Sequence, residues 1–412
     1  MIILEFKIKG KKTQFSAIDS AIRTGQFIQN KCLRLWMDNQ GVGRYDLSKF
    51  CAELAKEFGF ADELNSMARQ ASAERAWSAI AKFYDNCKKQ IPGKKGYPKF
   101  KHNSRSVEYK TSGWKLDKSR RYITFTDGKN IGKLKLVGTC DLNFYQLKQI
   151  KRVRLVRRAD GYYCQFCVAI DVVEELEPTQ AAIGLDVGLN FFYTDSQGKQ
   201  EENPRYYRKA EKQLKKLQRR VSKKFKKRKK KGDRQSKNYK KARQRLAKKH
   251  LKVSRQREEH AKRLARCVIK SNDFVAYEDL KVRNMVRNQK LAKSINDAGW
   301  YQFRVLLEHF GTKFGRVTVA VSPNYTSQDC SSCGTTVKKS LSTRTHTCRC
   351  GCVLDRDENA AINILKRGLS TVGHTGTWAS NALNAGGDEP STGVGESLHQ
   401  QGLSTNQESH SL

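Results

Sequence analysis

Apolar residues recur with two different periods in the first 175 positions of the chain. Between residues 14 and 92 they return every three or four positions, which predicts helices that each bury one face. From residue 104 to residue 174 apolar and polar positions alternate, as in half-buried strands, and residues 1–10 also have a strand pattern. We therefore expect a β domain from residues 1–10 and 104–175, in the form of a small barrel, with a helical region at 11–103 inserted after its first strand.

Two cysteines lie inside one of these predicted strands. Cys164 and Cys167 have the Cys-x2-Cys spacing that is found in many metal sites. Three positions apart on a strand, however, the two side chains lie on opposite faces of the sheet. We therefore expect buried thiols at these positions rather than metal ligands.

The segment from residue 205 to residue 257 combines a helical period with an extreme charge. Lys and Arg fill 27 of its 53 positions, and its only acids are Glu211 and Asp233. Apolar residues still return at intervals of three and four, and Gly232 with Asp233 breaks the pattern between two arms. The expected apolar seam consists of Ala210, Leu214, Leu217, Val221 and Phe225 in the first arm and Ala242, Leu246, Val253, Ala261, Leu264 and Val268 in the second. This pattern predicts a helical hairpin whose other faces are almost wholly basic.

The charge of the whole chain indicates a polyanionic partner. In 412 residues, 81 Lys and Arg stand against 40 Asp and Glu, which gives a formal net charge of +41. Self-repulsion on this scale destabilises a compact state unless a polyanion neutralises it. A run of charges is ordinarily a solvated face, but between residues 205 and 257 nearly all charges share one sign. We expect nucleic-acid phosphates to be bound by the hairpin. The expected contacts are Lys223, Lys224, Lys226, Lys227 and Arg228.

Several classes of protein are excluded by what the chain lacks. No stretch approaches the roughly 18 apolar residues of a membrane span, and the first residues do not have the pattern of a secretory signal. The twelve cysteines are scattered except for one cluster, which is typical of a reducing compartment. We expect an intracellular, cytoplasmic protein without membrane contact. Residues 369–412 contain hardly any hydrophobic cluster, so we expect a disordered tail there.

Two acidic residues in the second half of the chain are associated with short apolar strands. Asp186 interrupts a buried strand pattern between Gly184 and Gly188, which allow another backbone or a phosphate to approach closely. Glu278 follows directly on a second apolar strand. Asp279 is the alternative there, but it faces the opposite side if the strand continues. An RNase H-like sheet begins in this way, with a carboxylate that points off its first strand.

A third acid lies at the start of a predicted helix. Asp357 precedes an apolar helical face, and Asn359 and Asn363 can lie along one side of the same helix. The apolar face consists of Ala360, Ala361, Ile364 and Leu365. Asp355 is the competitor for the third position, although its place before the helix suits a cap better. Two strand carboxylates and one helix carboxylate are the oxygen ligands that two Mg²⁺ ions need for phosphodiester hydrolysis.

The cysteine cluster has the spacing of a structural zinc site. Cys330 and Cys333 form a Cys-x2-Cys pair followed by glycine, and a second group follows in Cys348-Arg-Cys350-Gly-Cys352. Four thiolates with such spacing form a closed tetrahedral site for Zn²⁺. The second group is shortened to Cys-x-Cys. We expect Cys348 and Cys350 to complete the site, with Cys352 as the alternative.

With these residues, the chain resembles TnpB, the family of transposon-encoded RNA-guided DNA nucleases related to compact type V CRISPR effectors. The resemblance covers residues 180–366 in its motifs and the N-terminal half in its architecture only. The motifs are Gly184-Leu-Asp-Val-Gly188, Tyr277-Glu-Asp-Leu280, Ser294-Ile-Asn-Asp-Ala-Gly-Trp300, Ser322-Pro with Ser327-Gln-Asp-Cys-Ser-Ser-Cys-Gly334, and Asp355-Arg-Asp-Glu-Asn-Ala-Ala-Ile-Asn-Ile364.

The resemblance implies a multidomain fold. The RNase H-like (RuvC) nuclease domain would combine residues 180–204, 263–320 and 353–368. The basic hairpin at 205–262 would be an insertion in that domain, and residues 321–352 would form a zinc ribbon. The N-terminal half would be a wedge-like β-barrel that carries a helical recognition region.

The resemblance also implies an activity and its partners. A guide RNA made from the transposon end would pair with target double-stranded DNA next to a short motif that the protein reads. Asp186, Glu278 and Asp357 would then cut the DNA, and Arg344 resembles a basic residue that directs substrate to this site. The protein would be associated with the nucleoid while it is bound to DNA. The alternatives are a nuclease-inactive RNA-guided repressor and a transposase that transfers DNA strands.

Overall fold

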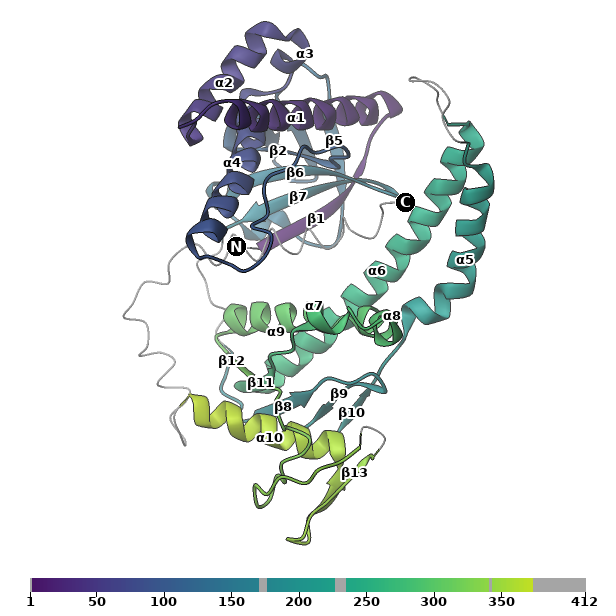
Figure 1. Ribbon diagram of the computed structural model, residues 1–412. Helices are drawn as coiled ribbons and strands as arrows, with labels where there is room; N and C mark the ends of the chain where they lie inside the picture. Colours follow the sequence, from purple (N-terminus) through teal and green to yellow (C-terminus); the bar gives the residue numbers. More distant parts are fainter. Residues whose placement is uncertain (1, 170–175, 227–234, 341–342, 373–412) are drawn as a thin grey trace. The chain divides into compact units, whose positions relative to one another are not determined.

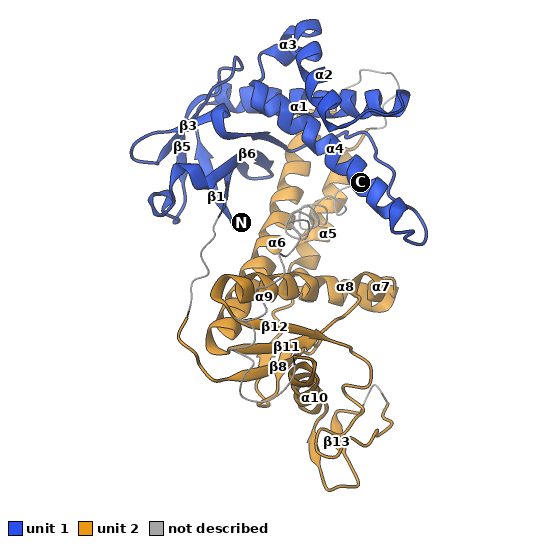
Figure 2. Ribbon diagram, turned by 90° about the vertical axis from the view of Figure 1, so that its left-hand side faces the viewer, with its two compact units in different colours: residues 1–171 blue, residues 172–412 orange. Residues whose placement is uncertain are grey.

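The computed structural model describes residues 2–169, 176–226, 235–340 and 343–372 of the chain (Figure 1). Lys227, Arg228, the Gly232-Asp233 break and most of the expected tail lie outside the described residues. The chain forms two compact units, residues 1–171 and 172–412, which are coloured separately in Figure 2. We describe each unit by itself.

The first unit is an antiparallel sheet with a helical layer. Its seven strands lie in the order β2-β6-β7-β1-β5-β4-β3. The strands are β1 (Ile2–Lys9), β2 (Ser106–Tyr109), β3 (Trp114–Leu116), β4 (Tyr122–Phe125), β5 (Gly132–Val137), β6 (Ile150–Arg158) and β7 (Gly161–Val168). The helices between β1 and β2 are α1 (Lys12–Asp38), α2 (Arg44–Glu57), α3 (Gly59–Asp62) and α4 (Ser66–Lys88), and three 3-10 turns follow at η1 (Thr111–Gly113), η2 (Leu142–Phe144) and η3 (Leu147–Gln149).

One hydrophobic core joins this sheet to its helices. Alternate residues of β6, Val153 and Leu155, are fully buried, as the period of two in the sequence predicts. They belong to the same buried cluster as Ile18 and Ile28 of α1 and Leu54 of α2. The helical segment after the first strand thus covers the sheet because each element has one apolar face.

The sheet is not the closed barrel that the strand pattern suggested. Its edge strands β2 and β3 do not pair with each other within the described residues, although they follow one another in the chain. The short turn η1 joins them, and a Cβ built at Gly113 in this turn would lie only 3.0 Å from Tyr109. Cys164 and Cys167 are both buried free thiols on β7, as expected from their strand spacing.

The second unit has a mixed five-stranded sheet in the order β10-β9-β8-β11-β12. Strands β8, β11 and β12 are parallel, and β9 and β10 are antiparallel to their neighbours. The strands of the unit are β8 (Ala182–Asp186), β9 (Phe191–Asp195), β10 (Gln200–Glu202), β11 (Phe274–Glu278), β12 (Val317–Val321) and a separate hairpin of β13 (Thr345–Thr347) with β14 (Val353–Asp355). The helices are α5 (Tyr206–Lys224), α6 (Lys237–Ser271), α7 (Val282–Met285), α8 (Gln289–Ala298), α9 (Trp300–Phe314) and α10 (Arg356–Thr371).

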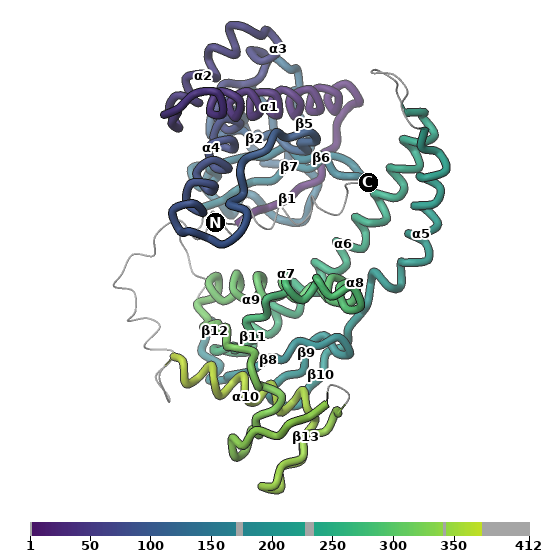
Figure 3. Tube along the Cα trace, in the orientation of Figure 1, coloured from purple at the N-terminus to yellow at the C-terminus, as the bar shows by residue number. Residues whose placement is uncertain are grey.

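Helices cover both faces of this sheet. Val275 and Tyr277 of β11 pack with buried residues of α6 and α9, whereas Phe274 and Ala276 pack with Ile364 of α10. Successive residues of a strand point to opposite faces, so the two sets follow from the period of two. Figure 3 shows α10 on the side of the sheet opposite to α9.

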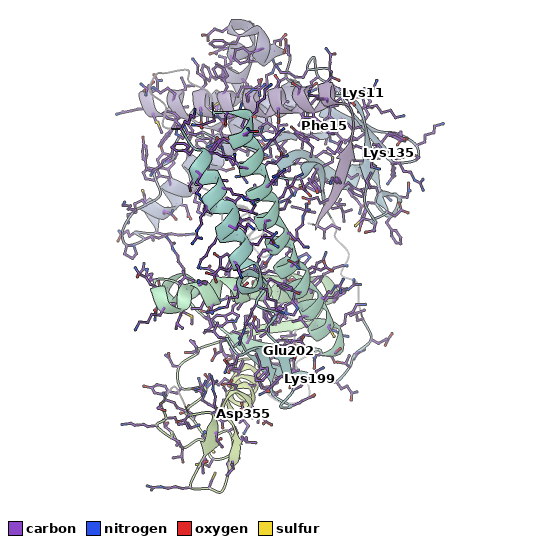
Figure 4. All side chains as sticks on the ribbon, turned by 90° about the vertical axis from the view of Figure 1, so that its right-hand side faces the viewer. Lys11, Phe15, Lys135, Lys199, Glu202 and Asp355 are labelled. Carbon is purple, nitrogen blue, oxygen red and sulfur yellow. The ribbon has the colours of Figure 1, made fainter. Side chains whose placement is uncertain are left out.

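The predicted basic hairpin is formed by α5 and α6, which lie side by side in Figure 4. Its apolar seam is centred on Ala210, Leu214 and Val253. Phe225 is not part of this seam, because its side chain is 55% exposed just after α5 ends, with its ring 5.8 Å from that of Tyr239. Helix α6 is continuous across the expected boundary at residue 262, because its C-terminal half carries the residues that pack on the sheet.

The expected tail begins later than its composition suggests. Helix α10 continues through residues 369–371, since Leu369 packs against the cluster that contains Phe274 and Ile364. Residues 373–412 lie outside the described residues. Among the described helices, none combines the length and the apolar character that a membrane crossing requires.

Candidate active site

Asp186 and Glu278 are the last residues of two adjacent parallel strands. The register pairs Leu185 of β8 with Tyr277 of β11, so the next residue on each strand lies at the same level. Asp186 follows Gly184 by two positions and Glu278 follows Ala276 by two, which places both acids on the face of the sheet that α10 covers. The two strands thus bring acids that are 92 positions apart in the sequence to one edge.

Helix α10 brings its first turn to the same edge. A Cβ built at Gly184 would lie 2.1 Å from the carbonyl oxygen of Ala361, and one built at Gly368 would lie 2.6 Å from the Cβ of Ala276. Gly184 and Ala276 are register partners, so α10 crosses the sheet from β8 at Ala361 to β11 at Gly368. Asp357 is the second residue of the helix. The charges of Glu278 and Asp357 both act on Asp186, so the three predicted acids lie near one another. Among the described residues, they do not form a group whose ligand atoms all lie within 4.8 Å of one another.

Asp355 is the cap of this helix, as expected. Its carboxylate accepts hydrogen bonds from the backbone N–H of Asp357 at 2.8 Å and of Glu358 at 3.4 Å. Figure 4 labels Asp355 at this end of α10. Asp279 points to the other side of the sheet, where it pairs with Arg304 of α9. Asp279 therefore does not compete with Glu278, and Asp355 serves as the helix cap while its charge also acts on Asp186.

Asp186 lies close enough to the other two acids for their charges to affect its pKa. Burial raises the pKa of Asp186 well above its ordinary value of 3.8, and the neighbouring charges of Glu278 and Asp357 raise it further. Burial also raises the pKa of Glu278, against the effect of a hydrogen bond from Thr326 and the charge of Arg367. Within the described residues, no hydrogen bond or ion pair satisfies the carboxylate of Asp186.

Two arginines lie beside the third acid. Arg356 approaches Asp357 at 3.1 Å and Arg344 approaches it at 3.4 Å, measured between guanidinium nitrogen and carboxylate oxygen. The side chain of Arg344 is half exposed, whereas that of Asp357 is 16% exposed. The structure thus places Arg344 at the edge of the acid cluster with a surface free to meet solvent.

The cysteine cluster lies in the segment between β12 and α10 that also contains the β13–β14 hairpin. The sulfurs of Cys330, Cys333, Cys348 and Cys350 all lie within 4.8 Å of one another, and Cys352 is not part of this group. Two glycines with positive φ close the turns: Gly334 donates to the carbonyl of Cys330 and Gly351 to that of Cys348. Four sulfurs around one point are the donor set that suits a tetrahedral Zn²⁺. Among the described residues, this is the one group of three or more metal-ligating side chains so tightly spaced.

Three further residues connect the cluster to the acids. Thr326 donates from its hydroxyl to a carboxylate oxygen of Glu278 at 2.7 Å. Asn359 and Asn363 of α10 are buried and donate to backbone carbonyls of the segment between Thr326 and Asp329. The spacing of the two asparagines beside the apolar face of the helix predicted that they lie along one side of it. No sequence pattern distinguishes Thr326.

The basic hairpin contains a cavity of about 340 Å³ between its two arms. No lining residue is acidic. The lining residues are Leu217, Arg220, Lys224, Asn238, Lys241, Ala242 and Arg245. Of the contacts expected from the sequence, Lys224 lines this cavity, and Lys223 and Lys226 are exposed near it in the chain. The cavity therefore combines four cationic side chains with the apolar side chains of Leu217 and Ala242.

Solved structures with the same architecture define the class of this fold. The structure titled "Cryo-EM structure of the Cas12f1-sgRNA-target DNA complex" matches with a TM-score of 0.52 at 15% identity, over 85% of this chain and 82% of that chain. The structure of the mini-RNA-guided endonuclease CRISPR-Cas_phi3 matches with a TM-score of 0.54 at 11% identity, over 89% and 92%. The fold is thus that of compact, multidomain α/β CRISPR effectors.

Relatives that match in sequence identify the family of the chain, whereas the solved structures show only its fold. Residues 165–289 match the family OrfB_IS605, described as a probable transposase, and residues 300–364 match the Cas12f1-like TNB domain. A putative RNA-guided DNA endonuclease of Streptomyces pristinaespiralis is 32% identical over 361 residues, or 84% of each chain. The Escherichia coli K12 protein InsQ, with the same description, is 27% identical over 53% of this chain and 57% of its own length. The chain belongs to the TnpB family, which confirms the resemblance seen in its motifs.

Proposed function

We propose that this protein is an RNA-guided DNA endonuclease. It cleaves target double-stranded DNA beside a short adjacent motif, by two-metal phosphodiester hydrolysis at Asp186, Glu278 and Asp357. The observation that carries this proposal is the convergence of the three acids where β8, β11 and α10 meet. The sheet of the second unit is then an RNase H-like RuvC domain.

The acids suit divalent cations. The negative charges of Glu278 and Asp357 raise the pKa of Asp186, so the ionised cluster is unfavourable unless a cation neutralises it, and no described donor satisfies Asp186. Oxygen ligands of this kind prefer Mg²⁺, with water and substrate phosphate as the remaining ligands. Bound by these acids, Mg²⁺ would activate the attacking water and stabilise the charge of the leaving oxygen.

The side chains around the acids have supporting roles. Thr326 holds one oxygen of Glu278, which fixes the direction of that carboxylate. Arg344 and Arg356 set positive charge beside Asp357, at the place where a phosphodiester would approach. Charge-assisted hydrogen bonds from guanidinium groups are well suited to phosphate oxygens.

The remaining parts of the chain would bind nucleic acid or stabilise the fold around the acids. Cys330, Cys333, Cys348 and Cys350 would hold a structural Zn²⁺ in a zinc ribbon. The cations of the α5–α6 hairpin neutralise phosphates of the guide RNA or of its duplex with DNA. The first unit would be the wedge and recognition part, which reads the adjacent motif while base pairing reads the target. The guide RNA would derive from the transposon end.

Single substitutions of the acids test the proposal. The full chain is purified with its copurifying RNA, the RNA is sequenced, and a matching DNA duplex is offered in magnesium. Asp186→Ala, Glu278→Ala and Asp357→Ala should each abolish cleavage and leave guided DNA binding intact. Asp279→Ala is the matched control, since its side chain lies on the α9 face, and it should cleave like the wild type. Normal cleavage by any of the three variants would refute the assignment of that residue.

One alternative is favoured by a specific observation. The family that matches residues 165–289 is described as a probable transposase, and strand transfer uses the same kind of acid cluster. The purified protein offered its own transposon ends should then join them to a target, whereas the guided endonuclease only cuts matched DNA. A nuclease-inactive repressor is disfavoured, because a protein that only binds has no use for three converging acids. Equal behaviour of the wild type and Asp186→Ala in magnesium would favour it.

A further inference from the structure

Thr326 is the only described side chain that donates a hydrogen bond to Glu278. Its hydroxyl lies 2.7 Å from a carboxylate oxygen of Glu278 and 3.3 Å from the carbonyl oxygen of Pro323. The hydroxyl has one proton, and the carboxylate oxygen of Glu278 is the nearer of its two acceptors. Thr326 is 4% exposed, so no water competes freely for this bond.

The backbone around Thr326 is fixed by helix α10. Asn363 donates from Nδ2 to the carbonyl of Thr326 at 2.9 Å and to that of Asp329 at 2.7 Å. Asn359, one turn earlier, donates to the carbonyl of Asp329 at 2.8 Å. Both amides are buried, at 7% and 0% exposed, so each of these bonds would be costly to lose.

The same helix also holds the first pair of cysteines. The backbone N–H of Ser331, next to Cys330, donates to Oδ1 of Asn359 at 2.9 Å. Arg367 reaches the carboxylate of Asp329 at 2.8 Å and the carbonyl of Ser322 at 3.2 Å. One face of α10 thus fixes the segment from Ser322 to Ser331, and the N-terminus of the helix carries Asp357.

We propose that Thr326 is a positioning residue that aims the Glu278 carboxylate at the metal site, and that the four-cysteine segment holds Thr326 in place through α10. This inference rests on the proposed function. Groups that orient metal ligands through hydrogen bonds affect metal affinity although they do not touch the metal. The cysteine cluster therefore supports the chemistry of the acids as well as its own fold.

The test measures metal binding directly, in addition to cleavage. Mn²⁺ uptake by the purified full chain is followed by electron paramagnetic resonance, and Asp186→Ala defines the uptake that does not involve the acids. Thr326→Val removes the hydroxyl at nearly constant shape and should weaken the acid-dependent Mn²⁺ affinity about tenfold or more, while Thr326→Ser stays within about twofold of the wild type. Cleavage in magnesium should follow the same order. Zinc content and guided DNA binding should not change in either variant.

The outcomes separate this inference from the function on which it rests. Wild-type affinity in Thr326→Val, or equal loss in the valine and serine variants, would overturn the positioning role while the endonuclease stands. Equal uptake by the wild type and Asp186→Ala would refute the metal centre itself, and the role of Thr326 with it. If Thr326→Val loses zinc, Thr326→Ala, with its smaller side chain, replaces it. Its acid-dependent Mn²⁺ affinity should then be about tenfold or more below that of the wild type, and wild-type affinity would overturn the positioning role.

Discussion

Gly184 on β8 and Ala361 on α10 are so close that no side chain fits between them. A Cβ at Gly184 would lie 2.1 Å from the carbonyl oxygen of Ala361 and 2.9 Å from the Cβ of Leu365. Contacts below 3.0 Å with a backbone atom require the helix itself to move. The glycine thus allows α10 to rest on the sheet at the height that brings Asp357 to Asp186.

Gly184→Ala should therefore lift α10 and separate the acids. Overpacking of this kind costs about 1–3 kcal/mol of stability, and a misplacement of about 1 Å can lower the cleavage rate about 100-fold. Thermal unfolding and single-turnover cleavage measure the two effects. Gly59→Ala is the control, because nothing lies within 4 Å of a Cβ at that position. Full activity of Gly184→Ala would show that the close approach is not required.

Asp186→Asn should stabilise the protein when magnesium is absent. Burial and the neighbouring acids raise the pKa of Asp186, so the folded state binds a proton more tightly than the unfolded state. Its contribution to stability is present below the unfolded pKa of 3.8 and is lost as pH rises through the raised value. In magnesium-free buffer, the melting temperature of Asp186→Asn should exceed that of the wild type, and by more at about pH 8 than at about pH 5. A lower melting temperature of the variant at the higher pH would contradict the raised pKa.

The sequence indicated the acids because each of them interrupts or begins an apolar pattern. Asp186 and Glu278 can be recognised from the sequence alone, because the apolar residues that precede each of them predict a short buried strand. The position of Thr326 is not visible in this way, since its partner lies 48 positions away and its local segment has no period. Long-range contacts of loops thus require coordinates.

The extent of the elements was harder to predict than their type. The period of three and four in the basic segment gave both arms of the hairpin, but the same period continues through residue 262 without a change where the helix turns from solvent to the sheet. Phe225 satisfied the seam spacing although α5 ends one residue before it. A periodic pattern does not show where a helix stops packing on its partner, and for this reason Phe225 was assigned to the seam. The open sheet was missed because the alternation of a strand does not show which strands pair at the edges.

Cys350→Ser should remove zinc and, through α10, reduce cleavage. Its sulfur belongs to the group of four within 4.8 Å, and a serine hydroxyl is a poor substitute for a thiolate ligand. Cys352→Ser is the matched control two residues away, outside that group. Metal analysis of the purified variants and their melting temperatures provide the measurement. Zinc loss in Cys352→Ser together with retention in Cys350→Ser would reverse the ligand assignment.

Glu108→Gln should destabilise the first unit strongly. The carboxylate is 3% exposed and pairs with Arg152 at 2.9 Å, Arg154 at 2.6 Å and Arg75 at 3.5 Å. Burial opposes its ionisation, but these arginines hold its pKa at about 2, below the ordinary 4.5. The carboxylate therefore stabilises the folded state above pH 4.5, and this stabilisation is lost as the pH falls through about 2. Removing one partner of a buried charge network costs about 3–5 kcal/mol.

Denaturant unfolding at neutral pH measures this cost, with the exposed Glu53→Gln as the control. The difference in stability between the wild type and Glu108→Gln should shrink on acidification, because the wild-type carboxylate then becomes protonated. A difference that does not depend on pH would mean that packing, rather than the charges, accounts for the effect.

Neutralising cations of the hairpin should change how nucleic-acid binding depends on salt. Lys224 of α5 and Lys241 of α6 face the same cavity, where no lining residue is acidic. Each phosphate contact contributes about 0.7–0.9 to the slope of log affinity against log salt, so the double variant Lys224→Gln/Lys241→Gln should flatten the slope by about 1.4–1.8. Filter binding of the copurified RNA over a range of salt concentrations measures it. The control Lys49→Gln/Lys56→Gln removes two exposed charges from α2. If both double variants flatten the slope equally, the hairpin has no special role and only the net charge matters.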